Sequence, residues 1–233
     1  MNQFNKGLRD GIPIGIGYLS VSFTYGILAV SNGLNYFEAV LISLTTLTSA
    51  GQFAGLTIMT SLGSYIEMLV AQLTINLRYG LMSISLSQKT DSKFNGRHRW
   101  LLGAFITDEI FAVASSQKEK VSKEYFSGLS MIPYFSWALG TLFGALLGSI
   151  LPESLSSALG IALYGMFIAI VVPKMREDHH VSLIVFIAIA LSCMFHYVPG
   201  LNKVPIGFSI TICAFIASLI GALLYPEKVQ EEA

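Results

Sequence analysis

The chain alternates between long apolar stretches and short polar connections along its whole length. The apolar stretches predict helical segments at about 11–31, 36–60, 63–87, 99–116, 126–150, 154–173, 180–198 and 204–225. A helix rises 1.5 Å per residue, so about 20 apolar residues cross the ~30 Å hydrocarbon core of a bilayer. The pattern therefore predicts an all-α, polytopic membrane protein with six to eight hydrophobic segments in a single integral membrane domain, residues 1–233.

Composition supports a membrane protein and leaves little room for other classes. The chain is 53% hydrophobic and 12% charged, whereas soluble domains carry about 25% charged residues. A formal net charge of zero argues against nucleic acid as a partner. Cys193 and Cys213 lie in apolar segments and are expected to be small buried side chains. No metal-ligand spacing, phosphate-binding loop or nucleophile with a base is visible, so we predict no cofactor and no enzyme activity.

Basic residues cluster in the short connections and predict the orientation in the membrane. Lys6 and Arg9 precede the first segment, where no signal-peptide cleavage site is evident, so the N-terminus is expected to be retained and cytoplasmic. Further basic residues occupy three later connections: Lys89, Lys93, Arg97 and Arg99, then Lys118, Lys120 and Lys123, then Lys174 and Arg176. All of these connections are expected on the cytoplasmic side.

This orientation conflicts with a simple count of crossings. Residues 36–87 must return to the cytoplasm in an odd number of crossings, yet they contain two segments of spanning length. Segment 99–116 must begin and end inside. Either 36–60 dips in and out while 99–116 is re-entrant, which leaves six full crossings, or all eight segments cross and one basic loop violates the charge rule. We favour the re-entrant solution, because interrupted backbone is tolerated at membrane depth where it lines a cavity.

The stretch LTSAGQFAGLTI (47–58) places Ser49, Gly51 and Gln52 inside an apolar segment. Thr48, Ser49 and Gly51 predict a break there, although a continuous helix that packs its small residues against a neighbour is the alternative. Gln52 offers an amide donor and an acceptor. It suits the charged groups of an amino acid or, alternatively, a hydrogen bond between helices.

The next segment carries polar residues at depth. Gln72, Asn76 and Ser83 share one helix face at spacings of four and seven, which predicts a face toward protein or a water path. Arg78 points about 200° away from Asn76 on a regular helix. It is therefore expected to snorkel or to hold a second element. Glu67, near the start of the segment, is expected in the headgroup region.

Asp108 and Glu109 are adjacent carboxylates within an apolar stretch. In a low-dielectric setting both cannot ionise cheaply, so one is expected to hold a proton near neutral pH. A carboxyl that loads and releases a proton is what a proton-coupled carrier needs. Alternatively, Asp108 forms an ion pair with Arg78 inside the bundle.

Two weaker patterns concern packing. Gly140, Gly144 and Gly148 repeat every four residues and predict a close contact between helices. Gly26 precedes Gly51-Gln52-Phe53 by 25 positions, as Gly140 precedes Gly165-Met166-Phe167, which suggests a weak internal repeat of the kind transporters use. Trp137 is expected to be an interfacial aromatic.

Taken together, TSAGQFAGLTI, INLRYGLM and FITDEIFAV, in this order, resemble the large subunit of the azaleucine-resistance (AzlC-type) branched-chain amino acid exporters. GIPIGIGYLSVSFTYGILAVSNGLNYFEAVLIS near the N-terminus and IALYGMFIAIVVP (161–173) also resemble that family, and the similarity covers about residues 8–225. One departure is Tyr164, where many relatives carry an acidic residue. If that acid couples protons elsewhere, this chain must use Asp108 or Glu109 alone.

The resemblance implies a bacterial plasma-membrane exporter of valine, leucine, isoleucine and perhaps methionine, working with a small AzlD-type membrane subunit. Its polar blocks fall on Ser49, Gln52, Asn76, Arg78, Asp108 and Glu109. We expect Ser49, Gly51, Gln52 and Asn76 to bind substrate, and Asp108, Glu109 and Arg78 to handle the proton or to form an ion pair. The alternatives are a passive channel for small polar solutes and a non-transporting scaffold subunit.

Overall fold

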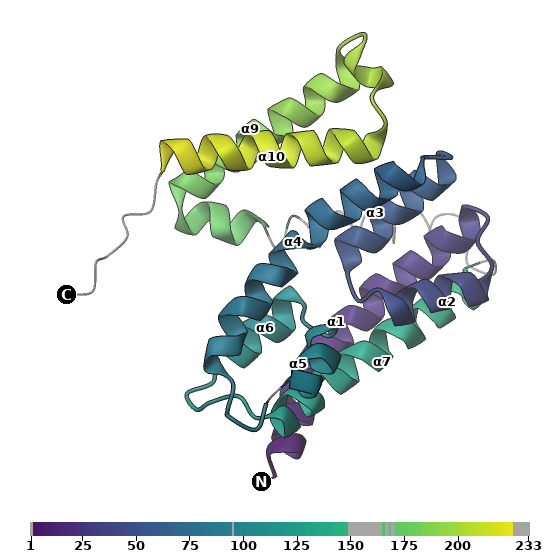
Figure 1. Ribbon diagram of the computed structural model, residues 1–233. Coiled ribbons are helices and arrows are strands. Elements are labelled where there is room, and N and C mark those ends of the chain that lie inside the picture. Colours follow the sequence, from purple (N-terminus) through teal and green to yellow (C-terminus); the bar gives the residue numbers. More distant parts are fainter. Residues whose placement is uncertain (1, 95, 149–164, 166–167, 169–170, 226–233) are drawn as a thin grey trace. The chain divides into compact units, whose positions relative to one another are not determined.

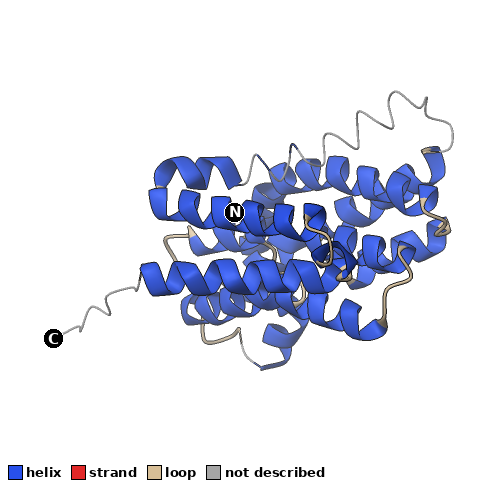
Figure 2. Cartoon of the chain, turned by 90° about the horizontal axis from the view of Figure 1, so that it is seen from above, coloured by secondary structure: helices blue, strands red, loops and turns tan. Residues whose placement is uncertain are grey.

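A computed structural model describes residues 2–94, 96–148, 165, 168 and 171–225. The regular elements in these ranges are helices, accompanied by an isolated bridge between Thr90 and Val121 (Figure 1; Figure 2). The predicted all-α class is therefore confirmed. The chain forms two compact units: Met1–Leu56 with Asn76–Ile161, and Thr57–Ile75 with Ala162–Ala233.

Among the described residues, four helices are long and apolar enough to cross a membrane. They are α1 (Gln3–Ser31), α7 (Lys123–Leu147), α9 (His179–Tyr197) and α10 (Ile206–Leu224). Helix α4 (Tyr65–Lys89) has 25 residues, enough to span by length. Its polar residues, Glu67 and Arg78 among them, lower its hydropathy. The predicted segment 154–173 and Tyr164 lie almost entirely outside the described residues.

Helices α1 and α7 pack in parallel along their full lengths. A Cβ added to Gly7 of α1 would lie 2.1 Å from the carbonyl oxygen of Tyr125, and one added to Gly26 would lie 2.2 Å from that of Thr141. In α7, Gly140 and Gly144 approach the α1 backbone in the same way. The close contact predicted from the glycine repeat is therefore confirmed, and α1 is the partner.

The predicted segment 36–60 is two short helices, α2 (Tyr36–Thr45) and α3 (Ser49–Thr60), that fold back on each other. A tight turn containing Gly33, at φ +95°, leads from α1 into α2. Asn35 then starts α2 through a capping box with Glu38. Because Ala39 and Leu56 both pack with Tyr25 and Ala29, α2 and α3 form a hairpin whose open end lies near the end of α1.

The break between these helices lies at Thr46–Thr48, slightly earlier than predicted. Ser49 and Gly51 already belong to α3. Thr48 explains the difference, because its hydroxyl accepts a hydrogen bond from the Gly51 N–H at 3.3 Å and starts the new helix.

Segment 99–116 forms a second hairpin that approaches from the opposite end of the α1–α7 pair. Helix α5 (Gly96–Gly103) follows Phe94, whose ring contacts Phe126 near the start of α7. The chain then reaches Phe105, whose ring contacts Tyr134 half-way along α7. Helix α6 (Asp108–Ser115) returns to Gln117, which accepts a hydrogen bond from Lys6 near the start of α1.

The unit formed by residues 2–56 and 76–148 therefore contains hairpins at the two segments for which re-entry was favoured, and their course through the membrane stays a prediction. Helix α4 returns toward the start of α1 and α7, where the Lys89 ammonium donates to the Ser115 carbonyl. Thr90 and Val121 meet at the same end. The basic connections that follow α4 and α6 are thus gathered beside Lys6.

In the second unit, α9 and α10 form an antiparallel hairpin, with Ile184 against Gly221. The first turns of α4 pack beside α10. The carboxylate of Glu67 accepts the Gly207 N–H at 2.8 Å, and Glu67 is 2% exposed. The Glu67 carboxylate thus caps the start of α10, and its expected position at headgroup level stays a prediction. The second half of the suspected internal repeat includes residues 166 and 167, outside the described residues.

Candidate functional site

The tips of the two hairpins meet beside the midpoints of α1 and α7. A narrow cavity of about 10 Å³ lies there, lined by Tyr18, Leu47, Ser49, Tyr79, Thr107, Asp108, Glu109 and Trp137. Tyr18 is half-way along α1 and Trp137 half-way along α7. If both helices span the membrane, the cavity lies near mid-bilayer, where polar side chains persist only when they are paired or face water.

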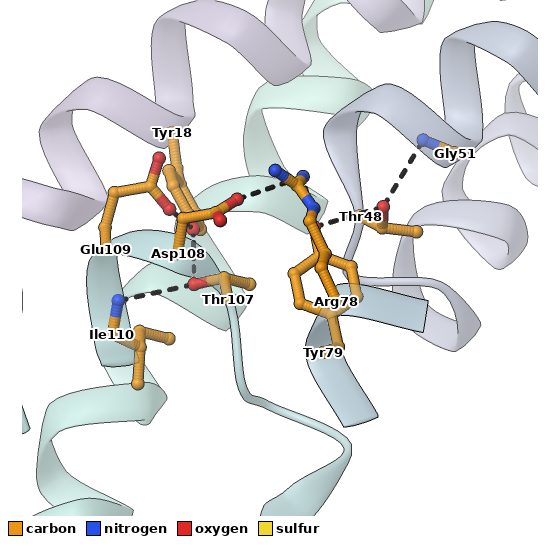
Figure 3. A network of polar contacts seen from close by, with 9 residues as sticks. All are labelled: Tyr18, Thr48, Gly51, Arg78, Tyr79, Thr107, Asp108, Glu109 and Ile110. Carbon is orange, nitrogen blue, oxygen red and sulfur yellow. Dashed lines mark hydrogen bonds and ion pairs between the residues drawn. The ribbon is translucent and has the colours of Figure 1, made fainter. Parts of the chain in front are cut away.

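Arg78 and Asp108 form an ion pair at the edge of this cavity (Figure 3). The guanidinium Nη2 lies 3.0 Å from Asp108 Oδ2, and the two side chains are 42% and 30% exposed. Arg78 also donates to the Tyr79 hydroxyl at 3.0 Å. Arg78 thus joins α4 to α6. Of the two roles predicted for it, snorkelling or holding a second element, the structure shows the second.

Glu109 is held differently from its neighbour. The Tyr18 hydroxyl lies 2.5 Å from Glu109 Oε2 and 2.6 Å from the Thr107 hydroxyl (Figure 3). The bond to the carboxylate has the length of a charge-assisted O–H···O⁻ hydrogen bond. Among the described residues, no cationic side chain lies within 4.0 Å of the Glu109 carboxylate. The two adjacent carboxylates therefore have different partners.

Two helices begin at the cavity, and threonine side chains cap both. The Thr48 hydroxyl caps α3, as described above, and the Thr107 hydroxyl accepts the Ile110 N–H at 3.4 Å in α6. The first turn of α6 contains Asp108 and Glu109, whereas the first turn of α3 contains no acidic residue. The positive end of the α3 dipole is therefore not neutralised by its own first turn.

Gln52 belongs to a buried hydrogen-bonded group beside the cavity, which we call the Gln52 cluster: Ser43, Gln52, Trp137 and Thr141. Trp137 Nε1 donates to Gln52 Oε1 at 2.7 Å, and Gln52 Nε2 donates to the Ser43 hydroxyl at 3.0 Å. Ser43 and Thr141 share a further hydrogen bond of 2.7 Å. Gln52 is 2% exposed, so the structure gives it the interhelical role, linking α2, α3 and α7.

The predicted residues therefore separate into two groups. Ser49, Asp108 and Glu109 line the cavity, and Arg78 reaches it through Asp108. Gly51, Gln52 and Asn76 do not form its lining. Asn76 lies three residues before Tyr79 and so on the same face of α4.

Sequence reasoning missed Tyr18, Tyr79, Thr107 and Trp137. Trp137 was expected at a membrane interface, yet it is 2% exposed and contacts the Tyr18 ring edge-on at 5.2 Å. The available signal was position: Tyr18 and Trp137 lie at the centres of their segments, whereas interfacial aromatics lie near the ends.

The cavity contains no obvious metal chemistry. Within the ranges that the structure describes, no three His, Cys, Asp or Glu side chains come together as a metal site requires. The lining offers two carboxylates, four hydroxyl groups and the apolar surfaces of Leu47 and Trp137, and the Arg78 cation is paired with Asp108 at its edge. Such a set can bind a small solute that carries both signs of charge and an apolar part.

Fold and site thus define a multi-pass membrane protein with a polar cavity between opposed hairpins. The family model described as AzlC protein matches residues 13–151. This is more than half of the chain, which therefore belongs to the AzlC family.

Relatives cover nearly all of the chain. An uncharacterised membrane protein of Archaeoglobus fulgidus is 32% identical over 225 residues, 95% of this chain and 94% of that protein. The inner membrane protein YgaZ of Escherichia coli is 26% identical over 230 residues, covering 94% and 91%. The branched-chain amino acid transport protein AzlC of Bacillus subtilis is 21% identical over 195 residues, covering 82% and 76%. No solved structure matches the chain.

Proposed function

We propose that this chain is the large subunit of a secondary transporter that exports branched-chain amino acids across the bacterial plasma membrane. Valine, leucine and isoleucine are the proposed substrates, with methionine as a further one, and proton movement drives export. A small AzlD-type membrane subunit is the proposed partner. The observation that carries the proposal is the cavity between the hairpin tips, because its lining matches the groups of an apolar amino acid.

The proposed binding mode follows from the charges around the cavity. The substrate ammonium group would bind the carboxylates of Asp108 and Glu109. Its carboxylate would bind the Ser49 hydroxyl and the N-terminal end of α3, where the helix dipole favours an anion. The aliphatic side chain would lie against Leu47 and the Trp137 ring. Gln52 supports this site indirectly, by fixing α3 against α7.

Access requires movement of a hairpin. Ligand cavities usually measure about 300–1,000 Å³, whereas this cavity of about 10 Å³ has room for about one water molecule. It must therefore widen before an amino acid can bind. The α2–α3 hairpin separates the cavity from one end of the α1–α7 pair, and the α5–α6 hairpin separates it from the other. Opening one hairpin at a time would give the alternating access that secondary transporters need.

The direction of the site in the membrane follows from the basic residues. The connections after α4 and α6 carry Lys89, Lys93, Lys118 and Lys120 and lie at the same end of the unit as Lys6. We therefore place the N-terminus and the α5–α6 hairpin toward the cytoplasm. The α2–α3 hairpin would then open to the outside.

Counterflow of labelled leucine in proteoliposomes tests the function. Vesicles that contain unlabelled leucine and the full chain, together with any small subunit that co-purifies, should accumulate labelled leucine transiently and saturably. Asp108→Asn should lower this uptake at least about tenfold, whereas Glu119→Gln, in the exposed connection after α6, should leave it unchanged. Flux proportional to leucine concentration would indicate a channel instead. A scaffold subunit would show no flux of its own in any variant.

A further inference from the structure

The two adjacent carboxylates at the cavity have different partners, which indicates different roles. Asp108 has a cationic partner, Arg78, at 3.0 Å. Glu109 has the Tyr18 hydroxyl at 2.5 Å, with no cation in ion-pair distance among the described residues. The guanidinium of Arg78 balances the charge of Asp108, whereas no cation among the described residues balances the charge of Glu109. The geometry therefore separates an ion-paired carboxylate from one whose charge a proton or a substrate ammonium group can balance.

The net charge of the cavity points the same way. Among the described residues, two carboxylates and one guanidinium leave one unit of negative charge at the cavity, and unbalanced charge inside a membrane is costly. A proton on Glu109 neutralises this charge. A substrate ammonium group next to the Glu109 carboxylate also neutralises it locally. If the proton and the substrate ammonium group bound at the same time, the ammonium group would lie beside an uncharged carboxylic acid. The electrostatic attraction between the two groups would then be lost.

We propose that Glu109 is a shared exchange site at which the coupling proton and the substrate ammonium group exclude each other, and that Tyr18 positions its carboxylate. This inference rests on the proposed function and deepens it. When the cavity faces the cytoplasm, an amino acid binds, the proton leaves Glu109 for cytoplasmic water, and the ammonium group takes its place. When the cavity faces outward, a proton from outside binds Glu109 and releases the amino acid. One proton enters for each amino acid exported.

Among the residues that the structure describes, the other titratable groups at the cavity are Tyr18 on α1, Arg78 and Tyr79 on α4, and Asp108 on α6. Helices α3 and α7 contribute Ser49 and Trp137, which do not titrate in this range. Of these described groups, Asp108 could produce a similar pH dependence. The test must therefore separate Asp108 from Glu109.

Leucine binding measured against pH makes this separation. For the purified full chain, with any small subunit that co-purifies, calorimetry should show affinity falling about tenfold per pH unit on the acid side, as one-proton competition requires. About one proton should be released per leucine bound there, as reported by a dye in weakly buffered solution. Affinity that is independent of pH, or that rises in acid as a symporter requires, would overturn the inference.

Variants identify the group. Glu109→Gln should bind leucine weakly and with less than about a twofold change over the same pH range. Asp108→Asn should also bind weakly but keep the pH slope, and Glu119→Gln should behave like the wild type. A flat profile in Asp108→Asn together with a wild-type slope in Glu109→Gln would assign the exchange to Asp108 and overturn the inference. Glu109→Asp, which keeps a carboxylate, serves if Glu109→Gln does not fold.

Tyr18→Phe tests the positioning role. The ring and its contact with Trp137 remain, but the donor to the Glu109 carboxylate is lost. Because the Glu109 carboxylate loses this donor, the midpoint of the pH dependence should shift while the slope stays. An unchanged midpoint would reject the role of Tyr18. Failure of the wild type to bind or exchange leucine at any pH would reject the proposed function itself, a different outcome from binding that ignores pH.

Discussion

Two polar groups lie side by side in the middle of the first unit, and they differ in how the protein satisfies them. In the Gln52 cluster, hydrogen bonds between side chains link α2, α3 and α7, and Ser43, Gln52, Trp137 and Thr141 are all at most 2% exposed. At the cavity, Arg78 and Asp108 remain 42% and 30% exposed. Polar residues within a membrane segment therefore serve two different purposes. A closed group, whose members are buried and hydrogen-bonded to one another as in the Gln52 cluster, holds helices together. A group open to a cavity can bind a solute.

The largest expected effect comes from widening the α1–α7 contact on which the closed cluster depends. Gly26→Ala would place a methyl group 2.2 Å from the carbonyl oxygen of Thr141, a cluster member, and 2.7 Å from the backbone nitrogen of Ala145. Neither backbone atom can move without separating the helices, so we expect little folded protein. Yield of monodisperse protein from detergent, and the thermal midpoint of what is recovered, measure this.

Gly17→Ala is the matched control for Gly26→Ala. It lies in the same helix, and an added Cβ would meet nothing within 4 Å. Replacing a helix-interior glycine by alanine favours the helix by about 0.5–1 kcal/mol, so folding should be unchanged or slightly improved. Equal behaviour of the two variants would contradict the close α1–α7 contact.

Gln52→Ala should come next, and its effect should be on stability. It removes the acceptor of the Trp137 N–H, and an unsatisfied buried group costs about 1–3 kcal/mol, whereas the Ser43 hydroxyl keeps its hydrogen bond with Thr141. About 2–4 °C per kcal/mol is typical of chains of about this size, so the thermal midpoint should fall by several degrees.

A paired substitution sharpens this test. Gln52→Met keeps the volume and removes the hydrogen bonds, and adding Trp137→Phe removes the orphaned donor. Since replacing both partners by apolar groups can be nearly neutral, the double variant should be more stable than Gln52→Met alone. If Gln52→Ala instead keeps its stability and loses only leucine affinity, Gln52 is a ligand and the division between the two groups fails.

Local patterns were enough to predict much of this fold. The glycine repeat of α7 was visible in the sequence, and it predicted the close contact between helices. The basic connections, if all are cytoplasmic, require an odd number of crossings between them, which favours re-entrant segments. Such signals are local or depend on a rule about charge, so a single sequence carries them. The break before α3 was predicted to within a few residues, since Thr48 was among the residues expected to supply it.

The pairing of polar side chains could not be predicted in the same way. Gln52 and Trp137 are 85 positions apart and meet through tertiary packing. Sequence alone left Gln52 with two roles for this reason. In the sequence, Tyr18 is indistinguishable from the apolar residues of α1. Its role depends on a hydrogen bond to Glu109 of α6, and that contact is visible only in the folded protein. Arg78 was the easier case, since a charge at depth demands an opposite charge.

At the open cavity, breaking the Arg78–Asp108 pair should cost transport more than stability. Both side chains are partly exposed, and ion pairs of this kind contribute about 0–1 kcal/mol. Arg78→Gln and Asp108→Asn should therefore fold with thermal midpoints within a few degrees of the wild type, while leucine counterflow falls at least about tenfold. The double variant should be no worse than either single one, because the two residues act as a unit. A loss of several kcal/mol, as when a buried pair is broken, would place this pair in the closed group.

The smallest effect is expected at Ser49, where the cavity lining meets the start of α3. Ser49→Ala removes one hydroxyl that we propose binds the substrate carboxylate, and a single hydrogen bond contributes about 0.5–1.5 kcal/mol, or about two- to twelvefold in leucine affinity. The thermal midpoint should not change, which distinguishes this variant from Gln52→Ala three residues later. Ser92→Ala, in the exposed connection before α5, is the control and should leave both quantities unchanged. If Ser49→Ala lowers stability and leaves affinity intact, the start of α3 belongs with the closed group, and the carboxylate-binding side of the cavity must lie elsewhere in its lining.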